Sequence, residues 1–175
     1  MLNFKPHFFS AILLFGLGGF LTPQFLRAAE IITAAPAVFD FKANARDILK
    51  EKITLANKSD VKLNVYAFVN NVLATSGEVE FLDPATADHS SSLANWISIS
   101  RGVLELAPGE KKTIDFLVEV NMRAKPGIYH AIISFAVGAT REAAESDLKE
   151  AGRININLEV LDSGKEILEI KKFMP

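Results

Sequence analysis

Residues 124–135 read Ala-Lys-Pro-Gly-Ile-Tyr-His-Ala-Ile-Ile-Ser-Phe, which joins a turn to an alternating strand with a tyrosine near its start. Pro126 fixes φ for the turn, and Gly127 tolerates a positive φ. From Tyr129 onward every second side chain is apolar or aromatic, so one face of the strand is expected to be buried. A tyrosine here can pack its ring inward and return its hydroxyl to the backbone of the preceding turn. The stretch therefore predicts a β-sandwich strand, with Tyr129 as its structural corner.

The rest of the chain repeats this pattern of short alternating runs between turns. No long amphipathic helix is expected, and Pro108-Gly109 suits the two central positions of a type II turn. We expect an all-β fold, an immunoglobulin-like antiparallel β-sandwich of seven or eight strands over residues 29–162. The candidate strands are 31–41, 49–55, 61–69, 96–100, 103–106, 114–120, 129–137 and 154–160, and residues 79–81 could form a further short strand.

Three connections carry more specific expectations. Pro36 interrupts the first strand, which favours an edge strand that bends or switches between sheets. The turn-forming residues 57–60 separate two alternating runs, which predicts a hairpin of 49–55 with 61–69. Residues 142–151 are charged and rich in alanine, so we expect a surface loop or one helical turn there.

The first 28 residues have the order of a secretory signal peptide. Lys5 precedes an apolar run from Phe8 to Leu21, and the small residues Ala28 and Ala29 follow. This run of about 14 residues is shorter than the roughly 20 that a membrane-spanning helix needs. We interpret residues 1–28 as a cleaved signal, and a retained signal that anchors the chain in a membrane is the alternative. Residues 163–175 are interpreted as a tail or the start of a truncated second module.

Composition limits the classes of partner. The chain has 175 residues, with 19 basic and 21 acidic side chains and no cysteine. Without Lys5 and Arg27 the exported part keeps 17 basic side chains, so its net charge is about −4. This mild acidity gives no reason to expect nucleic acid or an anionic membrane surface as a partner. Without disulfides, the stability of the exported domain has to come from its core.

Few residues suggest catalysis or metal binding. His89 lies near Asp83 and Asp88 in the loop 83–92, and an imidazole with carboxylates can hold a divalent ion. A complete metal site would need further donors, so a solvated loop is favoured. Ser90, Ser91 and Ser92 lack the context of a nucleophile, and His130 is expected on the outer face of its strand. We therefore expect no enzyme, no cofactor and no metal site.

One surface feature suggests interaction. In two strands the outward positions also carry large apolar groups, which gives the candidate interaction surface Tyr66, Phe68, Ile128 and Ile132. Contiguous exposed apolar surface often marks a contact site, although the tail or the long loop could cover this face instead. Trp96 is interpreted as packed in the core or at a sheet edge, in preference to an exposed platform for sugars.

Several motifs together resemble a known kind of domain. They are Asn57-x-Ser-Asp, Trp96-Ile-x-Ile-Ser, Leu104-x-Leu-x-Pro-Gly-Glu and Ala124-Lys-Pro-Gly-x-Tyr. Over residues 31–161 the chain looks like the peptidoglycan-binding domain of WxL-interacting proteins, and more distantly like the amino-terminal domain of periplasmic pilus chaperones.

The resemblance implies an exported module at the bacterial cell envelope, in the periplasm or at the cell surface. Its partner would be an envelope protein or a cell-wall polymer, and its function would be non-catalytic binding. The alternative is an assembly chaperone that adds a strand to its client.

Export with cleavage after Ala28 can be tested directly. Mass spectrometry of the exported protein should find a chain that starts at Ala29 or within a few residues of it, because Leu26 and Ala28 fit the recognition positions of the cleavage site. Recovery of the intact chain with Met1 from the cytosol would contradict the interpretation.

Overall fold

A computed structural model describes residues 31–75, 78–148 and 151–162. The signal peptide expected at 1–28 and the tail expected at 163–175 lie outside these residues. No helix in the described ranges is long and apolar enough to cross a membrane. The elements are β1 (Ile32–Ala35), β2 (Val38–Ala43), β3 (Ile48–Asn57), β4 (Leu63–Thr75), β5 (Glu78–Leu82), the 3-10 turn η1 (Pro84–Thr86), α1 (Leu93–Trp96), β6 (Ile97–Ile99), β7 (Leu104–Leu106), β8 (Lys111–Glu119), β9 (Gly127–Val137), α2 (Arg141–Glu145) and β10 (Gly152–Val160).

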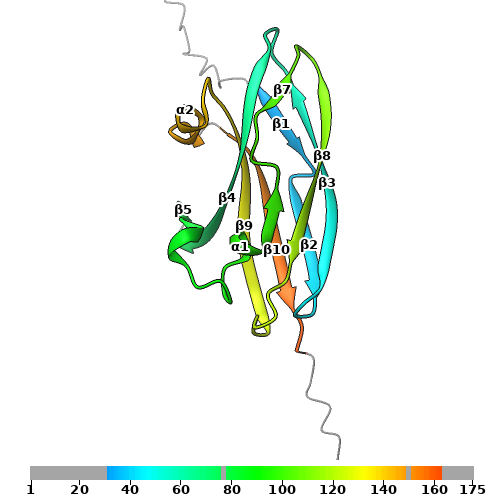
Figure 1. The fold of residues 1–175 in the computed structure, drawn as a ribbon, viewed down its shortest axis with the longest axis vertical. Coiled ribbons are helices and arrows are strands. Elements are labelled where there is room, and N and C mark those ends of the chain that lie inside the picture. Colours follow the sequence, from blue (N-terminus) through cyan, green and yellow to red (C-terminus); the bar gives the residue numbers. More distant parts are fainter. Residues whose placement is uncertain (1–30, 76–77, 149–150, 163–175) are drawn as a thin grey trace, which may run out of the picture.

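Two sheets pack face to face, as Figure 1 shows, so the all-β sandwich is confirmed. Sheet A has the order β1-β3-β8-β6, and sheet B has the order β2-β10-β9-β4-β5, with β7 also paired to β4. The paired strands are antiparallel except β2 and β10, which are parallel. The described residues contain ten strands, more than the seven or eight expected, because short edge strands are separate elements and the first strand is divided.

The expected alternation forms the core between the sheets. The inward side chains of β8 and β9 are buried, as are those of β10 and the middle of β4. Together they form one apolar cluster in which Phe116 and Phe135 are the largest fully buried side chains. Because the chain has no cysteine, this cluster is the main source of its stability.

The first strand changes sheets at Pro36, as the sequence predicts. β1 pairs with the end of β3 in sheet A, and β2 pairs with β10 in sheet B. The two strands are joined only by Pro36 and Ala37, and the peptide bond before Pro36 is cis. One short stretch therefore supplies an edge strand to both layers.

A second strand changes sheets on the opposite side of the sandwich. β6 pairs with β8 in sheet A, whereas β7 pairs with β4 in sheet B. Residues 100–103 join them. Both sides of the sandwich are thus closed by a stretch that is divided between the two sheets, so neither stretch covers the whole length of its neighbours.

The hairpin expected between 49–55 and 61–69 is wrong. β3 lies in sheet A and β4 in sheet B, so the turn after Asn57 crosses from one layer to the other. The alternating pattern does not distinguish these cases, because a hairpin and an arch between sheets have the same period of two.

Asn57 holds this crossing together. It is only 1% exposed, and its Nδ2 lies 2.7 Å from Val61 O, 2.9 Å from Ala107 O and 3.2 Å from Leu106 O. Its Oδ1 accepts hydrogen bonds from the backbone N–H and the hydroxyl of Ser59. One side chain therefore joins the end of β3, the start of β4 and the turn after β7.

Replacing Asn57 should be costly. Asn57→Ala leaves buried carbonyl groups without a donor, and we expect a loss of about 2–3 kcal/mol in the free energy of unfolding, measured by urea denaturation. Asn155→Ala, at an exposed position on β10, is the matched control and should change it by less than about 0.5 kcal/mol. Equal midpoints for the two variants would contradict this role of Asn57.

Candidate functional site: an open edge of both sheets

β2 forms one edge of sheet B, and its outer side is unpaired within the described residues. The carbonyl groups of Ala37 and Ala43 accept hydrogen bonds from β10. Because the backbone groups of successive residues point to opposite sides of a strand, Phe39 and Phe41 also face β10. The N–H and C=O groups of Val38, Asp40 and Lys42 therefore point away from the sheet, toward the free edge.

The first half of β3 has a free edge on the same side of the sandwich. β1 pairs only with residues 54–57 of β3, because the chain leaves for sheet B at Pro36. Asn57 N donates to Glu110 O beside β8, whereas Lys58 N donates to Ile31 O beside β1. By this alternation the backbone groups of Ile48, Lys50 and Lys52 face the side that β1 does not cover. We name the outer edges of β2 and of residues 48–53 the open edge.

Aromatic and aliphatic side chains line the sandwich behind the open edge. Phe39, Phe41 and Leu49 point inward but are only half-buried, since no strand of the described residues closes this side. The rings of Phe39 and Phe41 are stacked with centroids 5.6 Å apart, and Phe39 meets Phe116 edge-on at 5.1 Å. An extended segment added here would cover apolar surface as well as backbone groups.

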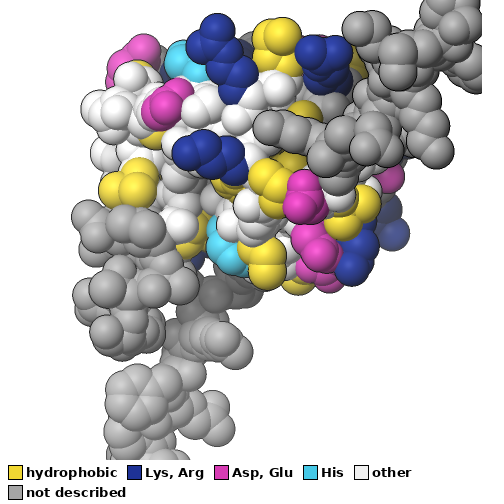
Figure 2. All heavy atoms as spheres, turned by 90° about the horizontal axis from the view of Figure 1, so that it is seen from below, with side chains coloured by type: hydrophobic (Ala, Val, Ile, Leu, Met, Phe, Trp, Pro, Cys, Tyr) yellow, Lys and Arg dark blue, Asp and Glu magenta, His cyan; other side chains and the backbone are white. Residues whose placement is uncertain are grey.

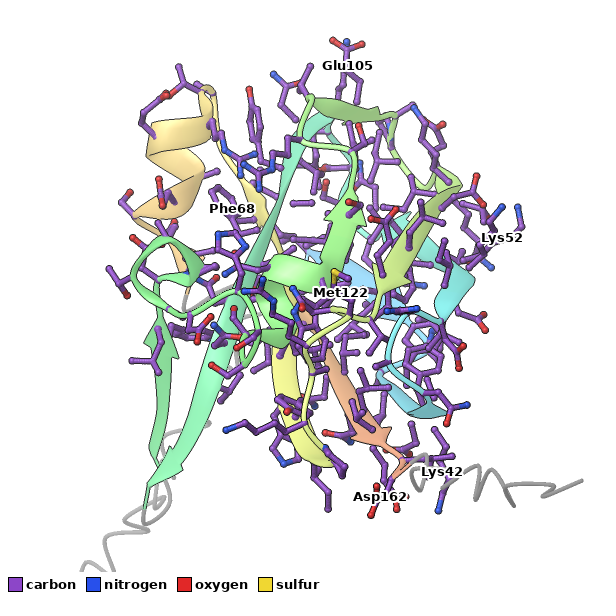
Figure 3. The ribbon with its side chains drawn as sticks, turned by 60° about the horizontal axis from the view of Figure 1, so that its bottom comes forward. Lys42, Lys52, Phe68, Glu105, Met122 and Asp162 are labelled. Atoms are coloured by element: carbon purple, nitrogen blue, oxygen red, sulfur yellow. The ribbon has the colours of Figure 1, made fainter. Side chains whose placement is uncertain are left out.

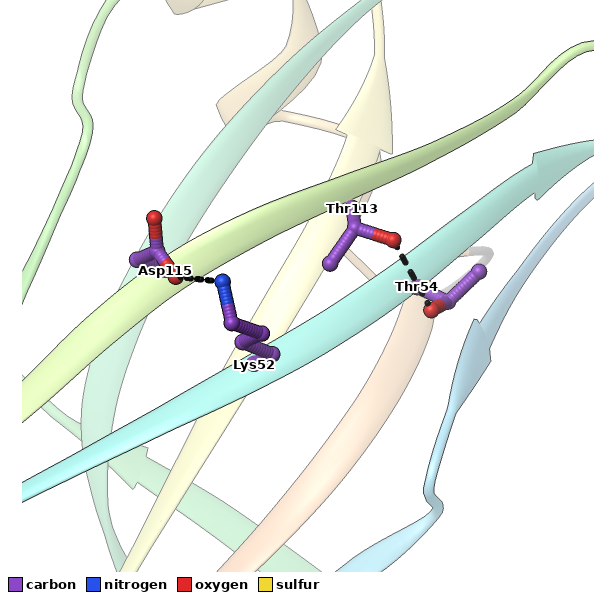
Figure 4. A network of polar contacts seen from close by, with 4 residues as sticks. All are labelled: Lys52, Thr54, Thr113 and Asp115. Atoms are coloured by element: carbon purple, nitrogen blue, oxygen red, sulfur yellow. Dashed lines mark hydrogen bonds and ion pairs between the residues drawn. The ribbon is translucent and has the colours of Figure 1, made fainter.

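Charged side chains flank the open edge. Lys42 Nζ lies 2.7 Å from Glu159 Oε2, and Lys52 Nζ lies 2.8 Å from Asp115 Oδ1. Figure 4 shows the second pair beside the contact between Thr54 and Thr113 on the outer face of sheet A. The hydrogen bond to the carboxylate, together with its charge, raises the pKa of each lysine. Such edge charges discourage unspecific pairing between sheets.

A polar row crosses the outer face of sheet B next to this edge. Asn157 Nδ2 donates to Asp40 Oδ1 at 2.7 Å, and Asn157 Oδ1 lies 2.8 Å from His130 Nδ1. The three residues are register neighbours on β2, β10 and β9. His130 thus lies exposed on the outer face and belongs to a hydrogen-bonded row that orients Asp40.

The candidate surface of Tyr66, Phe68, Ile128 and Ile132 does not form a contiguous exposed patch. Phe68 and Ile132 are buried, with 6% and 4% exposure, and Tyr66 is half-buried, so the expectation that they are exposed is wrong. Ile128 is 69% exposed but is the second residue of β9, at one end of the sandwich. Figure 2 shows hydrophobic groups on that end of the molecule scattered among charged ones.

The segment around α2 covers Phe68 and Tyr66. Ala144 and Leu148 pack on Phe68 and Tyr66, and the guanidinium of Arg141 lies 4.3 Å above the Phe68 ring. Figure 3 shows Phe68 between its strand and this segment. Gly138 permits the close approach, since a Cβ there would lie 2.6 Å from Ala144 N. The alanine-rich composition predicts a helical turn but not the face on which it packs.

The loop 83–92 uses its carboxylates to form turns. Asp83 Oδ1 accepts a hydrogen bond from Ala85 N, and Asp88 accepts from the N–H and the hydroxyl of Ser90. These bonds from Ser90 lower the pKa of Asp88. His89 is exposed, and no group of three His, Cys, Asp or Glu side chains in the described ranges is placed to hold a metal ion.

Tyr129 has the hydrogen bond that a structural corner requires. Its hydroxyl donates to Lys125 O at 2.8 Å, and its half-buried ring lies 4.9 Å from the ring of Trp96. Trp96 is buried at the end of α1, and its Nε1 donates to His89 O at 2.6 Å. It therefore packs in the core and ties the loop 83–92 to the sandwich.

Comparison with known proteins shows the fold only. No protein-family model matches the chain, and no curated protein is similar enough to match it. The PapD-like domain 7 of human CEP192 matches with a TM-score of 0.50 and 11% identity over 91% of this chain and 100% of that domain. A structure of a chaperone–tip adhesin complex of CFA/I fimbriae biogenesis also has a TM-score of 0.50, with 12% identity over 74% of this chain and 56% of that chain. The chain thus shares the immunoglobulin-like sandwich fold of these structures.

Proposed function

We propose that this chain is an exported, non-catalytic module that binds a protein in the bacterial cell envelope by accepting an extended segment at the open edge. The observation that carries the proposal is the unpaired backbone of β2 and of residues 48–53, on the same side of both sheets. Export rests on the signal-like order of residues 1–28.

The open edge supplies what strand addition needs. The outward N–H and C=O groups of Val38, Asp40 and Lys42 alternate at the spacing of a ladder, so they can pair with an extended partner. Every second side chain of that partner would meet Phe39, Phe41 or Leu49, which are half-buried. Main-chain hydrogen bonds would then contribute affinity, and these apolar contacts would select the sequence.

The charges at the edge favour a particular kind of segment. Lys42 and Lys52 are already paired with carboxylates of their own sheets, whereas Lys50 is exposed and forms no ion pair in the described residues. An acidic side chain opposite Lys50 would be favoured, and a basic one there would be disfavoured.

An assembly chaperone is the second candidate. It is supported by the open edge and by the fold shared with the fimbrial chaperone–tip adhesin complex. A chaperone would release its client to a later partner, whereas a structural module would keep it, so the rate of exchange between bound and free client distinguishes them.

A cell-wall polymer is the alternative ligand, because the sequence resembles the peptidoglycan-binding domain of WxL-interacting proteins. In that case purified cell wall, free of protein, would retain this chain.

Proline at position 40 tests the proposal. Asp40→Pro removes an N–H that faces the free edge and leaves the hydrogen bonds of Phe39 and Phe41 to β10 in place, so folding should be nearly unchanged. Asp40→Ala is the matched control, because it loses the same contact with Asn157 but keeps the N–H. We expect immobilised Asp40→Pro to bind its envelope protein about fivefold to tenfold more weakly than Asp40→Ala.

The result is read by quantifying the proteins that each variant retains from a detergent extract of cell envelopes. Equal retention by the proline and alanine variants, with both folded by circular dichroism, would exclude strand addition at β2.

A further inference from the structure

A gap interrupts the outer edge of β4 on the other side of the sandwich. β7 pairs with residues 63–65 of β4, and β5 pairs with residues 71–75, so residues 66–70, which pair with β9 on their other edge, face no strand of the described residues on this edge. Gly138 N, at the end of β9, donates to Asn64 O, so the even-numbered residues of β4 direct their backbone groups to β9 and the odd-numbered ones to this edge. The backbone groups of Ala67 and Val69 therefore point into the gap, which we name the β4 gap.

The β4 gap is the floor of a groove of about 500 Å³. Phe68 and Phe81 lie along it, α2 contributes one wall, and the loop 83–95 contributes the other. The five residues of the gap would span roughly 16 Å at the rise of a β-strand. The space thus matches a short extended segment placed in line between β7 and β5.

Arg141 fills only part of this gap. Its Nη2 donates to Ala67 O at 3.0 Å, and its Nη1 donates to Arg101 O at 3.2 Å. The guanidinium thereby replaces one donor that a neighbouring strand would supply. Among the hydrogen bonds of the described residues, none engages the N–H or C=O of Val69 on this side.

Asn70 adds an unsatisfied acceptor to the groove. Its Oδ1 is buried and has no hydrogen-bond partner, although buried polar atoms normally have one. Because this atom is buried in the free chain, a ligand that carries N–H donors would satisfy it after the amide of Asn70 turns toward the groove. An extended peptide carries such donors at every second residue, and it also carries the acceptors that the N–H of Val69 requires.

Two guanidinium groups of the groove form no ion pair among the described residues. They belong to Arg101, whose side chain is exposed, and to Arg141. The carboxylates of Asp83 and Glu145 also line the groove, but neither is within ion-pair distance of these guanidinium groups. An acidic side chain on the ligand would complement this charge.

We propose that the β4 gap is a second docking site, separate from the open edge, for a short extended segment of a partner protein that carries an acidic side chain. The segment completes sheet B between β7 and β5, pairs with Val69, donates to Asn70 Oδ1 and places its carboxylate beside Arg101.

Titration of the isotope-labelled chain with a capped peptide, acetyl-Thr-Val-Glu-Val-Thr-amide, tests the site by nuclear magnetic resonance. We expect saturable shifts of the amides of Ala67, Val69 and Asn70, with a dissociation constant in the millimolar range. The same peptide with N-methylated valines should bind at least fivefold more weakly, because it cannot form the ladder. Replacing its glutamate by glutamine should weaken binding about threefold.

Variants of the chain locate the site. Arg101→Gln removes the charge but keeps the carbonyl that Arg141 uses, and it should abolish the preference for glutamate over glutamine. Asn70→Ala should weaken binding of both peptides without lowering the melting temperature. Lys125→Gln, on a distant turn, is the matched control for charge and should change neither property.

Three results would overturn the proposal. The first is that the amides of Ala67 and Val69 do not shift at peptide concentrations up to 10 mM. Shifts found only at Asp40 and Lys50 would count as this result, because the peptide would then bind at the open edge. The second is slow hydrogen exchange of the Val69 amide in the free monomer, which would mean that the chain fills the gap itself. The third is shifts of these amides that depend on protein concentration alone, which would mean that a second copy fills it.

Discussion

An inner strand of a sheet pairs its backbone groups on both sides, and in this sandwich two stretches, each divided between both sheets, supply the strands that cover the inner ones. β1 and β2 divide one side between them, and β6 and β7 divide the other. A divided stretch cannot cover the full length of two neighbours. Among the described residues it therefore leaves two segments unpaired on one edge, residues 48–53 of β3 on one side and residues 66–70 of β4 on the other. The buried side chain of Asn57 fixes the crossing from β3 to β4, which joins the two sheets.

The strand pattern could be predicted from the sequence, but the pairing of the strands could not. Period-two alternation identifies β8, β9 and β10, and Pro36 indicates the sheet change, because proline is excluded from the middle of a ladder. The arch after Asn57 has the same alternation as a hairpin, so only the tertiary contacts of Asn57 reveal it. Phe68 and Ile132 occupy outward positions as predicted, yet the α2 segment buries Phe68, and helical composition does not tell which face a helix covers.

Both candidate sites consist of backbone groups, which explains why side-chain motifs did not reveal them. Nucleophiles, metal ligands and apolar patches are recognised by their side chains, whereas the open edge depends on where β1 ends and the β4 gap on where β7 ends. The side chains proposed to favour an acidic segment, Lys50 at the open edge and Arg101 at the β4 gap, belong to no recognisable sequence motif. A surface of this kind suits binding of extended protein segments, in agreement with the proposed role as an interaction module.

Hydrogen exchange of individual amides tests most directly whether the edges are open in the free protein. In the purified monomer, the amides of Lys50 and Lys52 should exchange rapidly, while those of Glu51 and Ile53, which face β8, should be protected. In β2, the amides of Asp40 and Lys42 should likewise exchange rapidly, while those of Phe39 and Phe41, which face β10, should be protected. This alternation between successive residues is the result that the account predicts. Uniform protection along residues 48–53 and 38–43 would contradict it, because the edge would then be covered.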